Sequence, residues 1–295
     1  MQSNFDMVIF LGSSELLYNC ARKARQFYGF PSPPIKIIET SYTAMKRKYI
    51  AEFGDIGSLS DKKSIFNFLR ALKGKVLLFS INNPYILPKD LCEKDYFVMI
   101  NLHHALLPAH PGRNAEAWTI YEQDVEGGCT WHYISADVDA GDIILQEKIQ
   151  ITEHTTSLSL LKQCEILALK SFEKFLPFEK IEAYASEQTI KNQQVMPPKR
   201  STDIPNNGIL DLTWKFSKQI SFLNAMNYGI AQVLGKPRVF MDGKEYTITS
   251  YKCIDSNDST LNNLPNTLDG HILVLNDKDG KKLILRLSSN TKAKT

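Results

Sequence analysis

Asn101, His103 and Asp139 are the side chains in this sequence whose types and spacing could perform chemistry. Asn101 and His103 end an apolar run, and residues two apart on a β-strand point to the same face. Asp139 follows 38 positions after Asn101, in a segment that contains Gly141. An amide N–H can stabilise a developing oxyanion, and an imidazole suits proton transfer near neutral pH. A carboxylate can orient that imidazole and raise its pKa.

Each of these residues also has a purely structural interpretation. A histidine near a strand end is commonly a buried residue whose hydrogen bonds are satisfied by its neighbours. Asp139 and Asp142 stand on either side of Gly141, and aspartate beside glycine is typical of turns. The residue types alone therefore leave a catalytic and a structural reading open.

Short apolar segments alternate with helical periodicity through the first 150 residues. The spacing predicts strands over 7–12, 35–39, 75–80 and 97–101, and helices over 16–27 and 64–72. Continuous apolar strands separated by helices indicate a parallel sheet covered on both faces. Ligands bind beyond the carboxyl ends of such strands, where Asn101 and His103 are expected.

The pattern changes after about residue 150. It predicts a helix over 157–175, a polar linker or surface loop over 188–207 and a helix over 216–228. Two hairpins should follow, with turns at 242–243 and 276–280. We therefore expect an α/β chain whose first domain covers residues 1–202 and whose smaller domain, a helix plus a β-rich part, covers 203–295.

Composition excludes several classes of protein. With 295 residues, of which 43% are hydrophobic, the chain can form one large domain or two and is not wholly disordered. A net charge of +3 argues against nucleic-acid or membrane binding driven by charge alone. No apolar run approaches the ~20 residues of a membrane-spanning helix, and no basic region precedes the first apolar stretch as in a signal peptide.

The five cysteines favour a cytoplasmic protein with reduced thiols. They are odd in number, widely spaced and contain no C-x-x-C pair. A disulfide framework or a zinc knuckle is therefore not expected, and no metal site is predicted.

The run Asn101-x-His103-x-x-Leu106-Leu107-Pro108, with Asp139-Ala140-Gly141 at its 38-residue separation, resembles the signature of formyltransferases that use N10-formyltetrahydrofolate. That group includes methionyl-tRNA formyltransferase, glycinamide ribonucleotide formyltransferase and the nucleotide-sugar N-formyltransferases. Residues 111–118 are most similar to the sugar N-formyltransferase branch. The resemblance is close over roughly residues 75–150, and it implies a Rossmann-like N-formyltransferase catalytic domain, a small C-terminal region and a homodimer.

Two positions depart from the family pattern. Ala105 stands where relatives often have serine, but it is not one of the three chemical groups. Asn224 stands where relatives commonly have arginine, which leaves the substrate contacts of the later helix open.

The implied reaction needs no nucleophile from the enzyme. An amine attacks the formyl carbon of the folate, and negative charge develops on the formyl oxygen. Asn101 and His103 would stabilise that oxygen, His103 would accept or relay the amine proton, and Asp139 would orient His103.

The co-substrate N10-formyltetrahydrofolate needs an apolar slot for its pterin. Residues 80–88 resemble the family's pterin-binding loop in position, so Tyr85, Ile86 and Leu87 are its candidate contacts. They could instead pack the end of the sheet. Asp142 is either a turn charge or a supporting partner of the catalytic groups.

Candidate contacts to the second substrate are less specific. Arg113 could pair with a phosphate or be a solvated loop charge. The other candidates are Asn114, Trp118, Phe222, Asn224 and Tyr228, among which Trp118 and Phe222 also suit a hydrophobic core. Trp131 and His132 lie on the strand before Asp139 and alternate in face; either could be a packing residue, and neither is assigned a role.

We expect formyl transfer to the amine of a nucleotide-linked amino sugar. By analogy this is a dTDP-3-amino-3,6-dideoxyhexose used in bacterial surface polysaccharide (lipopolysaccharide O-antigen) biosynthesis, with a dTDP-4-amino-4,6-dideoxyhexose as the alternative. Methionyl-tRNA is a further alternative, but its enzyme needs a strongly basic C-terminal surface, whereas here the second part of the chain carries acidic as well as basic residues. A folate-binding module without activity is disfavoured by the intact Asn, His and Asp.

Overall fold

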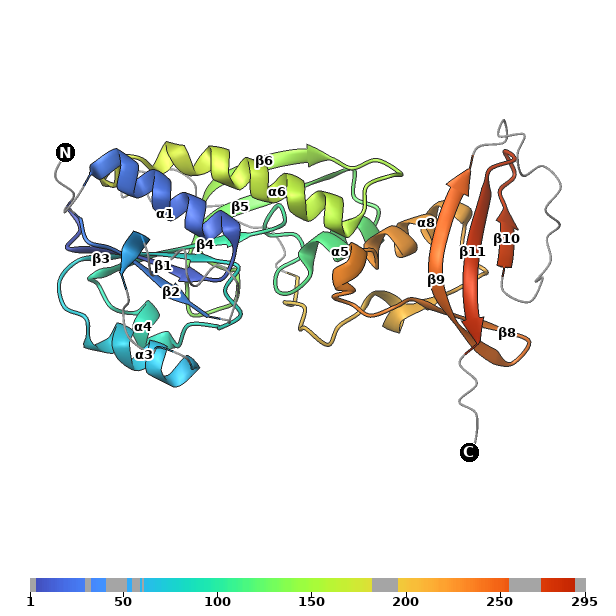
Figure 1. Cartoon of the computed structure of the whole chain (residues 1–295), viewed down its shortest axis with the longest axis horizontal. Helices are drawn as coiled ribbons and strands as arrows, with labels where there is room; N and C mark the ends of the chain where they lie inside the picture. The colour runs from blue at the N-terminus through green and yellow to red at the C-terminus, as the bar shows by residue number, and fades with distance from the viewer. Residues whose placement is uncertain are drawn as a thin grey trace. The chain divides into compact units, whose positions relative to one another are not determined.

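The computed structural model describes residues 4–29, 33–40, 52–54, 59, 61–181, 196–254 and 272–289. Residues 188–195 of the predicted linker lie outside these ranges. The chain divides into two compact units (Figure 1). The first comprises Met1–Ala115, Gly128–Ile149 and Lys162–Lys199, and the second comprises Glu116–Gly127, Gln150–Leu161 and Arg200–Thr295.

The first unit is built on a six-stranded sheet with the order β2-β1-β3-β4-β5-β6. The strands are β1 (Met7–Gly12), β2 (Ile35–Glu39), β3 (Val76–Ile81), β4 (Phe97–His103), β5 (Glu126–Tyr133) and β6 (Ile143–Gln150). Strands β2, β1, β3 and β4 are parallel, but β5 runs antiparallel to β4. The sheet is therefore mixed and not wholly parallel as the sequence predicts, because apolar runs report burial and not strand direction.

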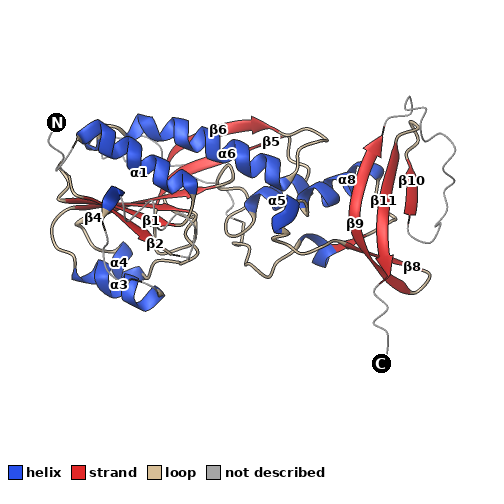
Figure 2. Cartoon of the chain, viewed as in Figure 1, coloured by secondary structure: helices blue, strands red, loops and turns tan. Residues whose placement is uncertain are grey.

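Helices cover both faces of this sheet (Figure 2). On one face lie α1 (Glu15–Tyr28) and α6 (Ser157–Phe172), and on the other lie α3 (Lys62–Ala71) and α4 (Lys89–Cys92). Helix α1 begins where the Ser14 hydroxyl accepts a hydrogen bond from the Leu17 amide at 3.1 Å. Asp61 caps α3 in the same way through the Ser64 amide at 2.9 Å.

Two apolar layers hold the helices to the sheet. Aromatic rings fill the layer under α6, namely Phe10, Phe79, Trp131, Phe172, Phe175 and Phe178. Aliphatic and aromatic side chains fill the layer towards α3, including Ile9, Leu11, Ile65, Leu69, Leu78 and Leu87. Full burial of one such side chain contributes about 1.5–3 kcal/mol, so these two layers anchor β3, β4 and β5.

Two predicted helices are shorter in the structure. Helix α6 ends at Phe172 and continues as a 3-10 turn over Glu173–Phe175, because Pro177 disfavours helical backbone at the residue before it. Helix α8 spans Phe216–Ala225, and the chain then turns where the Asn227 side chain accepts from the Gly229 amide at 3.0 Å. Further 3-10 turns cover Phe178–Lys180, Pro205–Gly208 and Gly229–Ala231.

The second unit contains a five-stranded sheet with the order β10-β11-β9-β8-β7. Its strands are β7 (Ile209–Leu210), β8 (Arg238–Met241), β9 (Lys244–Ile254), β10 (Ile272–Asn276) and β11 (Lys282–Ser289). Both predicted hairpins are present, β8 with β9 and β10 with β11. Asp242 and Gly243 both have positive φ, which is the backbone that a two-residue hairpin turn requires.

The second unit also takes two segments from earlier in the chain. Rings of α5 (Ala115–Tyr121) pack against α8, where Tyr121 contacts Phe222. The Ser157 hydroxyl at the start of α6 donates to the Ala225 carbonyl at 2.6 Å. These contacts place Glu116–Gly127 and Gln150–Leu161 outside the first unit, while the last boundary, after Lys199, lies close to residue 202.

Candidate active site

One face of the β4–β5 pair carries four polar side chains. Asn101 lies opposite His132, and His103 lies opposite Thr130. Opposite residues of an antiparallel pair project from the same face, with Cβ atoms about 4.5–5.5 Å apart. Trp131 projects from the other face, where its indole N–H donates to the Ser171 hydroxyl at 3.0 Å. Strand alternation therefore separates the polar face from the aromatic layer.

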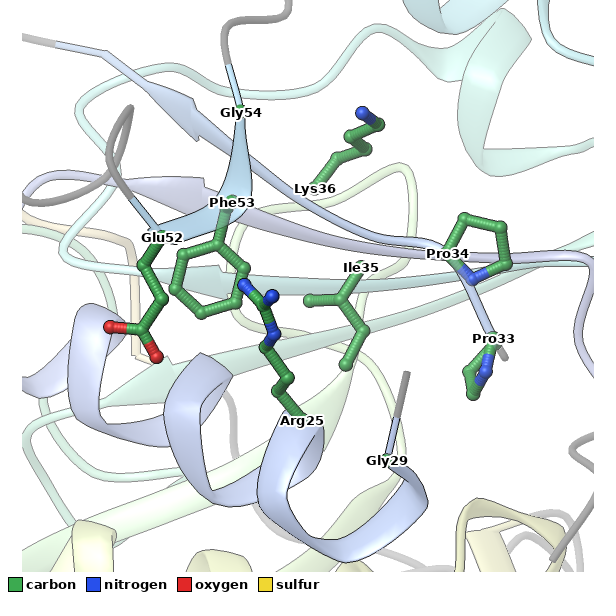
Figure 3. Close-up of a pocket in the computed structure, with 9 residues that line it drawn as sticks. All are labelled: Arg25, Gly29, Pro33, Pro34, Ile35, Lys36, Glu52, Phe53 and Gly54. Carbon is green, nitrogen blue, oxygen red and sulfur yellow. The ribbon is translucent and has the colours of Figure 1, made fainter. Parts of the chain in front are cut away.

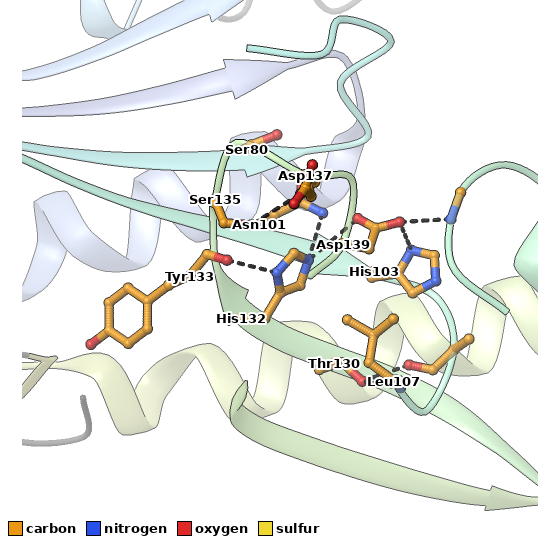
Figure 4. A network of polar contacts seen from close by, with 12 residues as sticks. Ser80, Asn101, His103, Leu107, Thr130, His132, Tyr133, Ser135, Asp137 and Asp139 are labelled. Atoms are coloured by element: carbon orange, nitrogen blue, oxygen red, sulfur yellow. Dashed lines mark hydrogen bonds and ion pairs between the residues drawn. The ribbon is translucent and has the colours of Figure 1, made fainter. Parts of the chain in front are cut away.

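Asp139 connects the two histidines of this face (Figure 4). Its Oδ2 lies 3.4 Å from His103 Nδ1, and its Oδ1 lies 3.5 Å from His132 Nε2. His132 Nε2 in turn lies 3.1 Å from Asn101 Nδ2. The structure thus brings together the three residues expected to act on the formyl group, and it places His132 between Asn101 and Asp139.

The backbone holds the Asp139 carboxylate in place. Asp139 has φ +52°, a left-handed conformation that aspartate tolerates better than most residues. Its Oδ2 accepts a hydrogen bond from the Gly112 amide at 2.7 Å. Gly112 has φ +93°, and a Cβ there would lie 2.3 Å from the Lys199 carbonyl oxygen. Only glycine fits at this position, so the amide that holds Asp139 depends on it.

Hydrogen bonding assigns the two nitrogens of His103. Nε2 lies 2.8 Å from the His110 carbonyl oxygen, which can only accept, so Nε2 carries a proton. Nδ1 is then the basic nitrogen, and it faces Asp139. Burial lowers the pKa of His103 below its ordinary value, while the Asp139 carboxylate acts in the opposite direction. The resting imidazole is therefore neutral, and a proton added at Nδ1 would meet a carboxylate.

Asp139 is ionised in this setting. Burial raises the pKa of its carboxyl, but His103, which is protonated at the acidic pH where Asp139 titrates, and the Gly112 amide outweigh burial and lower the pKa to about 2. The network therefore pairs one fixed negative charge with a neutral imidazole that can take up a proton.

Thr130 fastens the loop that follows β4. Its hydroxyl donates to the Ala105 carbonyl at 2.6 Å and accepts from the Leu107 amide at 3.1 Å. The Gln146 amide group donates to the same hydroxyl at 3.0 Å and to the Leu107 carbonyl at 2.8 Å. Because this loop leads to His110 and Gly112, Thr130 supports the partners of both His103 and Asp139.

We expect Thr130→Val to lower the free energy of unfolding by about 1–3 kcal/mol, because the buried Leu107 amide loses its acceptor. Urea unfolding followed by circular dichroism would measure the change. Thr249→Val is the matched control, because the Thr249 hydroxyl is exposed and bonds only the Arg286 carbonyl, and its effect should stay within about 0.5 kcal/mol. Equal stability of Thr130→Val and the wild type would contradict the assigned role of Thr130.

The candidate folate contacts differ from one another in environment. Leu87 is buried in the apolar layer towards α3, which agrees with the alternative that it packs the end of the sheet. The Tyr85 hydroxyl donates to the Thr40 carbonyl at 3.2 Å. Ile86 is 63% exposed and remains available to a ligand. Asp142 is exposed, and its backbone carbonyl accepts from the Tyr133 amide at 2.9 Å.

In the first unit, the candidate substrate contacts Arg113 and Asn114 follow Gly112 directly. The Arg113 guanidinium is exposed and donates to the Pro84 carbonyl, which ties this turn to the loop after β3. Asn114 has φ +55° and immediately precedes α5.

In the second unit, the remaining candidate substrate contacts are buried: Trp118, Phe222, Asn224 and Tyr228. The Asn224 side chain donates to the Glu153 carbonyl and accepts from the Tyr251 hydroxyl, each at 2.7 Å. The Tyr228 hydroxyl donates to the Glu116 carboxylate at 3.1 Å. These partners give Asn224 and Tyr228 structural roles, and their roles in substrate binding stay predictions.

From the sequence alone, no role is assigned to His132, and Thr130 is not among the candidates. Strand periodicity places both on one face of β5, but it does not show which face or which strand lies beside them. The register of β4 against β5 supplies that information, because it sets Asn101 opposite His132.

A pocket of about 440 Å³ lies elsewhere in the first unit (Figure 3). It is lined by the end of α1 and the start of β2, including Arg25, Ile35, Lys36 and Phe53. None of the predicted site residues lines it. The described ranges contain no group of three or more His, Cys, Asp or Glu side chains placed to hold a metal ion, and no helix long and apolar enough to cross a bilayer.

Solved structures share the fold of this chain over most of its length. A sugar 3N-formyl transferase solved in the presence of dTDP and 5-N-formyl-THF superposes with a TM-score of 0.71 at 15% identity, over 96% of this chain and 98% of that chain. An N-formyltransferase from Helicobacter canadensis, in complex with folinic acid and dTDP-3-aminofucose, superposes with a TM-score of 0.67 at 17% identity, over 96% and 100%. At these identities the likeness shows the fold, and it confirms the predicted α/β class with a second β-rich sheet.

This chain is similar in sequence to curated formyltransferases. The chain is 31% identical to the methionyl-tRNA formyltransferase of Fusobacterium nucleatum over 208 residues, which are 68% of this chain and 62% of that protein. It is 29% identical to the GDP-perosamine N-formyltransferase of Brucella melitensis over 168 residues, 56% of this chain and 60% of that protein. The chain thus spans about three fifths of the length of these relatives.

The formyl transferase family model matches residues 82–186. This range contains β4, β5 and the loop that carries Asp139. The match confirms the resemblance seen in the sequence, and it places a formyl transferase domain over residues 82–186.

Proposed function

We propose that this protein transfers the formyl group of N10-formyltetrahydrofolate to the amine of a nucleotide-linked amino sugar. The observation that carries the proposal is the network of half-buried Asn101, buried His103 and half-buried Asp139, which provides an N–H donor, a neutral base and a fixed carboxylate. The family match over the same residues supports it.

The network suits attack by an amine on a formyl carbon. Bound N10-formyltetrahydrofolate supplies that carbon and leaves as tetrahydrofolate. Asn101 donates an amide N–H to the oxygen that becomes negative. His103 accepts the amine proton at Nδ1, and the resulting imidazolium is held by the His110 carbonyl at 2.8 Å and Asp139 at 3.4 Å. The bond between the amine and the formyl carbon has formed by then, and His103 returns the proton to the departing nitrogen as the bond between the carbon and the folate breaks.

The loop after β3 fits a folate beside this network. Strand β3 pairs with β4 so that Ser80 lies opposite Asn101, and the loop therefore begins next to the proposed oxyanion donor. The Asn83 side chain accepts from the Tyr85 amide and donates to the Tyr85 carbonyl, both at 3.0 Å, which gives the loop a defined turn. Exposed Ile86 is the apolar surface that we assign to the pterin, with buried Leu87 supporting the loop from below.

For the acceptor we propose a dTDP-3-amino-3,6-dideoxyhexose, with the 4-amino isomer as the alternative. The named ligands of the two structural relatives, dTDP and dTDP-3-aminofucose, favour this class. Arg113 and Asn114 follow the Gly112 turn that holds Asp139, so they are our candidates for contacts near the reacting amine. We further propose that the enzyme acts in the cytoplasm as a homodimer, in surface polysaccharide biosynthesis.

Methionyl-tRNA is the second candidate acceptor, because a methionyl-tRNA formyltransferase is among the curated relatives. Such an enzyme needs many phosphate contacts, and its affinity falls steeply with salt. The chain has 32 acidic residues and a net charge of only +3, so its attraction for the phosphates of an RNA is weak. This favours the sugar nucleotide as the acceptor.

A panel assay tests the proposal. The purified protein would receive N10-formyltetrahydrofolate together with a dTDP-3-amino sugar, a dTDP-4-amino sugar, GDP-perosamine or methionyl-tRNA, and release of tetrahydrofolate and the mass of the formylated product would be followed. We expect fastest turnover with the dTDP-3-amino sugar. Turnover confined to methionyl-tRNA, or none with any amine, would overturn it.

A further inference from the structure

His132 is more deeply buried than either His103 or Asp139. Its side chain is only 2% exposed, and it lies directly opposite Asn101 in the β4–β5 register. It therefore contacts Asn101 from a rigid pair of strands, not from a loop. Burial of a polar ring at this depth is costly unless its nitrogens are hydrogen-bonded.

The hydrogen-bond partners of His132 show which ring nitrogen carries the hydrogen. Nδ1 lies 2.8 Å from the Tyr133 carbonyl oxygen, an acceptor only, so Nδ1 carries the hydrogen. In the neutral ring Nε2 then has only a lone pair. Asn101 Nδ2, at 3.1 Å, must be the donor to it. The other neighbour of Nε2, Asp139 Oδ1, is 3.5 Å away, beyond the usual length of such a hydrogen bond.

This assignment also orients the Asn101 amide. An asparagine amide can turn over and exchange its oxygen and nitrogen with little cost unless a partner discriminates between them. Nε2 of His132 discriminates, because it accepts from the NH₂ group and repels the amide oxygen. With one N–H held by His132, the second N–H of the same group stays available to another acceptor.

We propose that His132 is a positioning residue that keeps the amide nitrogen of Asn101, and not its oxygen, directed at the formyl oxygen. This inference rests on the proposed function and adds to it the residue that prepares the oxyanion donor. His132 itself touches neither substrate and moves no proton in this scheme.

A double-mutant cycle between His132→Phe and Asn101→Ala tests the proposal. His132→Phe keeps a planar ring but removes the acceptor, so kcat should fall about tenfold or more with KM for both substrates nearly unchanged. Asn101→Ala should cost about 10²–10³-fold. Because His132 acts through Asn101, adding His132→Phe to Asn101→Ala should cost no further activity.

His132→Gln is the conservative variant, because its side-chain oxygen can accept from Asn101, and it should recover most of kcat. His154→Phe is the matched control, since His154 is 81% exposed and should leave kcat unchanged. The proposal would be overturned if the kcat loss of the double variant equalled the product of the two single losses. A wild-type kcat in His132→Phe would also overturn it.

Nuclear magnetic resonance gives a readout that needs no turnover. Two-bond ¹H–¹⁵N spectra of the unliganded protein at neutral pH should show His132 as the neutral Nδ1–H tautomer, with its signals assigned by their loss in His132→Gln. An Nε2–H or doubly protonated ring would overturn the proposal even if His132→Phe failed to fold. If the proposed formyl transfer is wrong, turnover is absent in the wild type while the tautomer is as expected, so the two failures are distinguishable.

Discussion

Replacing His103 with glutamine should lower kcat for formyl transfer by about 10²–10⁴-fold, the range typical for loss of a general base. The side-chain amide of His103→Gln can still donate to the His110 carbonyl, which His103 Nε2 reaches at 2.8 Å, so the strand end keeps its hydrogen bond. What disappears is the basic nitrogen that faces Asp139. Steady-state assays with the dTDP-amino sugar accepted in the panel would measure the loss.

Thermal unfolding and circular dichroism should show that the His103→Gln variant is folded. His154→Gln is a control for the general effect of replacing histidine, and we expect wild-type turnover from it because His154 lies on the surface. Turnover of His103→Gln within a few fold of the wild type would remove His103 from the mechanism and leave Asp139 as the proton acceptor to be tested.

Much of the first unit could be predicted because its signals are local. The apolar runs that became β1, β3 and β4 are continuous, and each is buried as such runs are. Strand periodicity was also enough to place Asn101 and His103 on one face. The Asp242-Gly243 turn needs positive φ at both residues, so its sequence indicates a hairpin without further context.

The rest depends on contacts between distant segments. His132 gains its place from the register of β5 against β4, and nothing in the spacing of residues 126–133 reveals that register. The direction of β5 is equally hidden, because burial patterns are alike for both directions. Asn224 looks like a ligand contact in a helical pattern, but its partners Glu153 and Tyr251 lie 71 and 27 residues away. A single sequence offers no means to pair such residues.

Replacing Asp139 with asparagine should also lower kcat by about 10²–10⁴-fold, since loss of a buried carboxylate that supports a catalytic histidine has effects of up to about 10⁴. Asparagine is the informative replacement for two reasons. It tolerates the φ of +52° at this position, and its carbonyl oxygen can still accept from the Gly112 amide. The loss would therefore report the missing charge beside His103 and not a displaced loop.

The pH dependence separates this effect from a general loss of structure. The wild-type acid limb of kcat/KM should have its midpoint below the ordinary histidine value of about 6.5, because burial lowers the pKa of His103. The Asp139 carboxylate favours the charged imidazole, so removing it should lower that pKa further. The residual activity of Asp139→Asn should consequently show its acid limb at lower pH than the wild type. A limb at higher pH would show that Asp139 does not act on His103 through its charge.

Stability at low pH gives an independent check on the same carboxylate. The pKa of Asp139 in the folded protein is about 2, below its ordinary value of 3.8, so the folded state binds this proton less readily than the unfolded state. Ionised Asp139 therefore stabilises the fold above about pH 4, and this contribution is lost as the pH falls to about 2. Urea unfolding at a series of pH values should show a shallower decline for Asp139→Asn over that interval. Parallel declines in the two proteins would mean that the carboxylate is not held by Gly112 and His103 as the structure shows, and the base proposed at His103 would lose its partner.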